Sequence, residues 1–324
     1  MKPFESFLAR EFDEFINYRK QLGLAERPLR SFLLIFDRYL VEHKQPSGLL
    51  EPLFFLKLRA NLQMQARSVN TMLSNLRSFF QYLVRRDIYD QNPLRDIPPL
   101  AERYFMPFVF SPEQTDQLLD AACRNIRGTP QNLLYDAGMY LAISMLAHCG
   151  MRINEPLRLL KHHYRPDDGT IYIAKTKFRK DRLIPAPKAL REEIDQYLDM
   201  QDDYPADDQN PYLLSGRKAW PHRDHRIRAA FHQAVRDIGL SRERQTLGNI
   251  NFGAPTPHSL RHSFAVNTIK CLRERGGSPQ QALPVLASYM GHYKYQYTAA
   301  YLKVSDASDV TGLMAFAKSR LDPI

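Results

Sequence analysis

The segment Thr256-Pro-His-Ser-Leu-Arg-His262 predicts the start of a helix that carries a histidine and an arginine in its first turns. Its threonine is a favourable N-cap, and Pro257 suits the first helical position. His258 and Arg261 stand three residues apart, so they share one face of this helix. We expect His262, which adjoins Arg261, to point elsewhere. A guanidinium beside the free backbone donors of a helix start favours binding of an anion.

Three other short segments contain side chains that suit the same anion. Arg152 directly follows the apolar run Met139–Met151, which predicts a buried helix. Lys177 lies in a basic segment, His292 follows a glycine, and Tyr301 comes nine residues later. Taken singly, each residue is more often structural, because exposed arginines usually form surface salt bridges. In this combination and order, the residues instead indicate one phosphate-handling site.

The residue types point to metal-independent chemistry on a phosphodiester. Its anionic oxygens repel a nucleophile, and the chain lacks the dense carboxylate cluster that would hold two metal ions. Two guanidinium groups, those of Arg152 and Arg261, offer planar forks that match phosphate oxygens and stay charged at working pH. We therefore expect no metal and no cofactor. A phenol such as that of Tyr301 can then act as the nucleophile.

The order Arg, Lys, His-x-x-Arg, Gly-His, Tyr resembles that of the tyrosine recombinase (phage integrase-like) family. The resemblance covers nearly the whole chain and implies DNA cleavage through a 3′-phosphotyrosyl ester, followed by religation. Strand exchange would pass through a Holliday junction, in integration, excision or transposition. The catalytic residues that the resemblance implies are Arg152, Lys177, His258, Arg261, His292 and Tyr301.

The resemblance also implies a role for each residue. The arginines bind the phosphate, Lys177 protonates the departing 5′ oxygen, and the histidines donate hydrogen bonds to the phosphate or accept the phenol proton. Lys175 and Lys180 remain alternatives to Lys177. Tyr301 is selected among five nearby tyrosines by its spacing from the Gly-His histidine. Because nine residues of one straight helix would put these two residues on opposite faces, we expect a bend between them. We expect Glu155 to support the helix near Arg152.

The chain divides into two predicted domains. Apolar stripes at helical spacing predict a helical bundle, which the resemblance identifies as a core-binding domain over residues 1–98. A Pro-rich linker follows at 99–110, because proline disfavours helix before itself. The catalytic domain spans 111–324 and ends in a C-terminal tail helix. Within it, residues 170–174 and 182–185 predict two short antiparallel strands joined by the loop that carries Lys177.

The predicted fold class is therefore mainly α with one small antiparallel β-sheet. The family's fold implies a C-shaped clamp around double-stranded DNA. The formal net charge of +10 over 324 residues favours a polyanionic partner. Three scattered cysteines, a charged N-terminus and the lack of a long apolar run predict a cytoplasmic protein without a membrane span. The resemblance further implies self-association into a tetrameric synapse on DNA, with accessory or sister recombinases as further partners.

Two other functions use the same scaffold. A type IB topoisomerase-like enzyme that nicks and closes DNA would need similar residues, although the small helical N-terminal domain and the chain length argue against it. A DNA-binding accessory protein on an inactivated recombinase scaffold would need none of them. The presence of all six residues argues against that second alternative.

Overall fold

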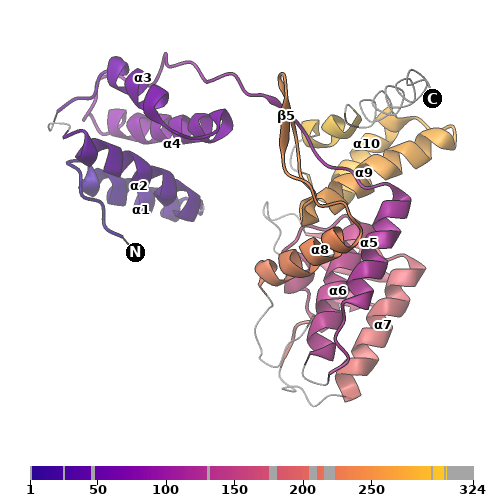
Figure 1. The fold of residues 1–324 in the computed structure, drawn as a ribbon. Helices are drawn as coiled ribbons and strands as arrows, with labels where there is room; N and C mark the ends of the chain where they lie inside the picture. The colour runs from indigo at the N-terminus through magenta and orange to yellow at the C-terminus, as the bar shows by residue number, and fades with distance from the viewer. Residues whose placement is uncertain are drawn as a thin grey trace, which may run out of the picture. The chain divides into compact units, whose positions relative to one another are not determined.

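The computed structural model describes residues 2–24, 26–44, 48–129, 132–174, 181–203, 210–214, 223–292, 295–302 and 304. The chain forms two compact units, Met1–Arg103 and Tyr104–Ile324. Figure 1 shows the four helices of the first unit and the larger second unit. Lys177, with its alternatives Lys175 and Lys180, and the expected tail helix lie outside the described residues.

The first unit consists of four helices around an aromatic core. They are α1 (Ala9–Gln21), α2 (Glu26–Glu42), α3 (Pro52–Asn61) and α4 (Ala66–Val84). Their apolar stripes converge on a buried set of rings in which Phe12, Phe36 and Phe79 are fully enclosed. Neighbouring rings meet at tilted or edge-on angles, the arrangement that aromatic pairs favour. The apolar periodicity thus accounts for a bundle with its own core.

Helix α6 (Leu133–Cys149) is the central element of the second unit. It contacts α5 (Pro112–Arg124), α7 (Lys188–Asp203), α8 (Asp224–Asp237) and α9 (Pro257–Glu274). Figure 1 shows α5, α7 and α8 grouped around it. From Ala137 to Cys149 every residue of α6 except Tyr140 and His148 is buried, as the apolar sequence of this stretch predicts. A capping box starts α5, because Ser111 and Gln114 exchange hydrogen bonds with each other's backbone.

The expected antiparallel sheet follows α6. After the short 3₁₀ turns Pro156–Arg158 and Lys161–His163, the strands β2 (Tyr164–Arg165), β3 (Thr170–Ile173) and β4 (Arg182–Pro185) pair in the order β2-β3-β4. Ile171 lies opposite Ile184, and both are fully buried against the core. The two predicted strands are therefore confirmed, and the sheet has one strand more than expected.

A second, mixed sheet is absent from the sequence prediction. The strand β1 (Tyr104–Met106) pairs in parallel with β6 (Ile250–Phe252), which pairs antiparallel with β5 (Gln245–Leu247). The sequence predicts an extended linker over residues 99–110. Part of that segment, Tyr104–Met106, is instead the sheet strand β1. The pairing of β1 with β6 spans more than a hundred residues and leaves no local pattern to detect. Strands β5 and β6, by contrast, form a local hairpin, and its two-residue turn Gly248-Asn249 was a signal in the sequence that the prediction missed. The mainly helical fold class is confirmed, with two small sheets instead of one.

The last described elements pack beside α9. Helix α10 (Pro279–Met290) ends at Gly291, which adopts the left-handed conformation with φ of 62°. Residues 296–302 form a further helical segment that carries Tyr301. His292 and Tyr301 therefore do not lie on one straight helix, as expected, because α10 ends at Met290 and Tyr301 belongs to a separate helical segment. In the described part of the chain, no helix is long and apolar enough to cross a membrane.

Candidate active site

The carboxyl end of α6 presents Arg152 to the site. Gly150 caps this helix in the left-handed conformation with φ of 56°, which a residue with a Cβ adopts only with strain. A Cβ at this position would also lie 2.5 Å from the ring of Phe264 on α9. The chain can therefore turn sharply and pass close to α9 only with glycine here. Arg152, two residues later, emerges with a side chain that is 23% exposed.

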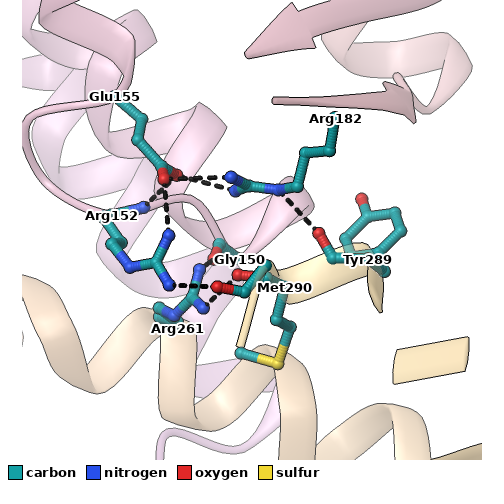
Figure 2. A network of polar contacts seen from close by, with 8 residues as sticks. Gly150, Arg152, Glu155, Arg182, Arg261, Tyr289 and Met290 are labelled. Carbon is teal, nitrogen blue, oxygen red and sulfur yellow. Dashed lines mark hydrogen bonds and ion pairs between the residues drawn. The ribbon is translucent and has the colours of Figure 1, made fainter. Parts of the chain in front are cut away.

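A buried carboxylate holds two arginines in place (Figure 2). Glu155 accepts hydrogen bonds from Arg152 Nη1 at 2.8 Å and from Arg182 Nη2 at 2.8 Å. Arg152 also donates to the carbonyl oxygen of Gly291 at 2.7 Å, and Arg182 to that of Tyr289 at 2.7 Å. Burial alone would raise the pKa of Glu155, but its bonds to Arg182 and the charges of both arginines hold that pKa below the usual value. The network therefore ties α6, β4 and α10 together.

Arg261 is almost completely buried at the centre of the site. Only 1% of its surface is exposed. It donates from Nη1 to the carbonyl oxygen of Gly150 and from Nη2 to that of Met290, both at 2.6 Å, as Figure 2 shows. Burial, and then the charge of Arg152, lower the pKa of Arg261 to about 10, which leaves the group charged at neutral pH. Two positive guanidinium groups thus lie close together with few carboxylates to balance them.

Tyr301 packs into this positive region. It is 5% exposed, and its ring lies nearly parallel to that of His292, with centroids 6.1 Å apart. His292 is oriented in turn by a hydrogen bond of 2.8 Å between its Nδ1 and the hydroxyl of Thr298. Burial raises the pKa of Tyr301, while Arg261, which is hydrogen-bonded to the phenol, and Arg152 oppose that rise. The phenol is protonated in the free protein and faces the groups that would stabilise its anion.

Two histidines on α9 complete the site, and the prediction for one of them was wrong. His258 and His262 are one helical turn apart, and their ring centroids lie 4.5 Å apart. His262 does not point elsewhere, because its ring lies 5.6 Å from that of Tyr301. In the sequence, the i, i+4 spacing between His258 and His262 already placed both on one face of the helix. The prediction relied instead on the adjacency of His262 to Arg261, which does not determine where the His262 ring points.

The histidines are neutral at physiological pH. Burial, together with neighbouring positive groups, lowers the pKa of His262 and that of His292 to about 3. His258 keeps more exposed surface at the edge of the site, and desolvation with the charges of Arg261 and Arg152 lowers its pKa in the same direction. Each neutral imidazole carries one donor and one acceptor nitrogen. The site therefore combines fixed positive charge with groups able to accept a proton.

Five of the six residues selected from the sequence come together here. Arg152, Arg261, His258, His292 and Tyr301 surround one small region, and Lys177 lies outside the described residues. Glu155 was expected to support this part of the chain, and its hydrogen bonds agree with that role.

Arg182 is a supporting residue that the sequence reasoning missed. The sequence offered only one signal for Arg182: it is a charged residue at the start of a short strand, three positions before a proline. Among the described residues, no group of three or more histidine, cysteine or acidic side chains is placed to hold a metal ion.

Comparison with known proteins places this geometry in a family. Residues 109–308 match the family model described as the phage integrase family. An integrase/recombinase of Sinorhizobium fredii, y4rE, is 30% identical over 99% of this chain and 97% of its own length. The tyrosine recombinase XerD of Brucella suis is 25% identical over 72% of this chain and 70% of its own length.

Solved structures share the fold at low sequence identity. A lambda integrase dimer bound to a core site matches with a TM-score of 0.64 and 13% identity, over 91% of this chain and 76% of that one. The XerH site-specific recombinase in a post-cleavage complex with DNA matches with a TM-score of 0.65 and 19% identity, over 87% and 78%. The family model covers more than half of the sequence, and y4rE aligns over nearly its full length. This chain therefore belongs to the phage integrase family.

Proposed function

We propose that the protein is a site-specific DNA recombinase that cuts and rejoins strands through a 3′-phosphotyrosyl intermediate. The observation that carries this proposal is the convergence of two guanidinium groups, neutral imidazoles and one buried phenol. Membership of the phage integrase family supports the same activity. The substrate is double-stranded DNA, and the reaction takes place in the cytoplasm without metal or ATP.

The chemistry follows from charge and bond balance. The phenolic oxygen of Tyr301 attacks the phosphorus, the bond from phosphorus to the 5′ oxygen breaks, and a 3′-phosphotyrosyl ester forms. Arg152 and Arg261 stabilise the charge that builds on the non-bridging oxygens in the transition state. The phenol proton passes to a neutral imidazole, that of His258 or His292. The ester conserves the bond energy, so a 5′-hydroxyl can attack it and restore the strand.

Lys177 supplies the proton to the departing 5′ oxygen in this proposal, and a chemical substitution tests it. A sulfur in place of that oxygen leaves as a thiolate and needs no proton. Lys177→Ala should therefore cleave ordinary DNA slowly and sulfur-substituted DNA at the normal rate. Lys175→Ala and Lys180→Ala serve as matched controls that cleave both substrates normally. If one of those controls shows the sulfur-dependent pattern instead, that lysine is the acid.

Covalent capture tests the activity itself. Wild-type protein is first used to select a duplex, by adduct formation, from fragmented DNA of its own source. In a nicked form of that duplex, the short fragment that carries the freed 5′-hydroxyl diffuses away, so a cleaved complex accumulates as a denaturation-resistant adduct. We expect an adduct with the wild type and with Tyr297→Phe, an exposed tyrosine four residues earlier, and none with Tyr301→Phe. Lack of an adduct with wild type would refute the proposal.

A second experiment separates recombination from nicking and closing. Recombination requires two DNA sites held in one synapse, with pairs of protomers exchanging strands. We therefore expect Holliday junctions only when the DNA carries two copies of the selected site. Relaxation of any supercoiled plasmid by the monomer would instead identify a topoisomerase-like enzyme.

A further inference from the structure

His262 occupies a place in the site that the proposed chemistry leaves unused. It lies on α9 one turn beyond His258, and its half-buried ring contacts two members of the site. The ring centroid is 4.5 Å from that of His258, at an interplanar angle of 80°. It is 5.6 Å from that of Tyr301, at 61°. His262 therefore stands between the exposed histidine and the nucleophile.

The geometry of these contacts constrains the nucleophile. His292 lies nearly parallel to the Tyr301 ring, at 24°, while His262 meets the same ring edge-on. The two rings therefore contact Tyr301 on its face and at an edge. Helix α9 also carries Arg261, which is hydrogen-bonded to the phenol, so the edge contact of His262 is a second point at which α9 holds the phenol. The position of the phenolic oxygen relative to the phosphate then depends in part on His262.

A nitrogen atom of His262 adds a second observation. Its Nδ1 is buried and has no hydrogen-bond partner among the residues that the structure describes. Nδ1 therefore does not orient the ring, which packs against His258 and Tyr301 through the ring contacts described above. His262 also stays neutral, because burial, and then the neighbouring His258 and Arg261, lower its pKa.

We infer that His262 is a positioning residue: its ring sets the spacing between His258 and Tyr301 and so controls the rate of strand cleavage. The inference rests on the proposed recombinase function and adds a residue to its machinery. His262 takes no proton and contacts no phosphate in this account. Its removal should therefore leave DNA affinity unchanged and slow the chemical step, because a small displacement of a reacting group is enough to lower a rate strongly.

The test compares four variants in a single-turnover assay on the selected nicked duplex. His262→Ala and His262→Asn remove the ring, His262→Phe keeps it without nitrogen, and His232→Ala removes a half-buried helical histidine that lies on α8. We expect adduct formation to slow roughly tenfold or more in the first two variants. We expect a rate within about threefold of wild type for His262→Phe, whose edge contact remains. His232→Ala should react as wild type does.

Two further measurements make each outcome decisive. Dissociation constants for the uncleaved duplex should stay equal in all variants, and thermal melting should show that each one is folded. Wild-type cleavage by His262→Ala would overturn the inference. So would a folded His262→Phe that binds DNA normally and cleaves as slowly as His262→Ala, because the nitrogen would then be the essential feature. A wild-type protein that forms no adduct would refute the recombinase function, which is a separate result.

Discussion

Glu155 shows how much the site depends on one buried carboxylate. It is hydrogen-bonded to Arg152 and Arg182, and only 9% of its side chain is exposed. Removing one partner of a buried ion pair leaves the other charges uncompensated, which costs about 3–5 kcal/mol. We therefore expect Glu155→Ala to lower the free energy of unfolding by roughly that amount. Urea denaturation of the purified protein measures it.

Glu14 provides the matched control at the surface. It also pairs with two arginines, Arg10 and Arg86, but on the solvent-exposed face of the first unit. Exposed pairs contribute little because water and salt screen them. Glu14→Ala should therefore change stability much less than Glu155→Ala. Equal losses for the two variants would contradict the account of the buried network.

The residues of the candidate site that were selected for chemistry could be found from the sequence, whereas Arg182, which supports them, could not. Arg152, His258, Arg261, His292 and Tyr301 follow a recognisable order along the chain. Arg182 was missed because its partner Glu155 lies 27 residues away and nothing local signals the pairing. His262 was misjudged because adjacency to Arg261 was given more weight than helical periodicity.

At the scale of elements, two glycine-capped helix ends place the site. Gly150 ends α6 and Gly291 ends α10, both in the left-handed conformation. The carbonyl oxygens of these two glycines accept hydrogen bonds from Arg261 and Arg152. The ends of two helices therefore serve as fixed acceptors that orient the two guanidinium groups of the candidate site.

A substitution at Gly150 should disturb both backbone and packing. Gly150→Ala forces a Cβ into the left-handed conformation and places it 2.5 Å from the ring of Phe264. Gly239→Ala forces the same conformation, with φ of 70°, where no atom lies within 4 Å. We expect Gly239→Ala to destabilise by about 1 kcal/mol and Gly150→Ala by clearly more. Equal melting temperatures would show that the close approach of α6 to α9 is unimportant.

Sequence patterns predicted the helices and strands whose formation depends on residues that are close together in the chain. The apolar stripes of the first unit and the strands after residue 170 both depend on neighbours in sequence. The parallel pairing of β1 with β6 joins residues 104 and 250, which no window of the sequence reveals. The spatial arrangement of distant segments is therefore the part that required the structure.

At the scale of the molecule, acid should destabilise the fold. The pKa of His262 and that of His292 is about 3 in the folded protein, against about 6.5 in an unfolded chain. Below pH 6.5 the unfolded chain binds protons that the folded chain does not, so the free energy of unfolding falls as the pH drops toward 3. Each such group contributes a slope of up to roughly 1.4 kcal/mol per pH unit.

Melting temperatures between pH 7 and pH 5 measure this effect, because most carboxylates stay ionised over that range. We expect the melting temperature to fall steadily with acidification, and His262→Phe to reduce the slope. A melting temperature that stays constant or rises would contradict the neutral, desolvated state of these imidazoles.

The division of the chain into two units agrees with separate tasks in the proposed function. The first unit has its own aromatic core, and the second holds every described residue of the candidate site. A net charge of +10 suits the extended phosphate backbone of DNA. The charge also makes binding sensitive to salt, because each contacted phosphate releases counterions.

The central claim is that Tyr301 forms the covalent bond to DNA, and peptide mapping tests it most directly. The adduct with the nicked duplex is digested with a protease and a nuclease, and tandem mass spectrometry locates the nucleotide on the peptide. The account predicts one modified residue, Tyr301, joined to a 3′-phosphate. A nucleotide on Tyr295, Tyr297 or any other side chain, or a linkage to a 5′-phosphate, would contradict it.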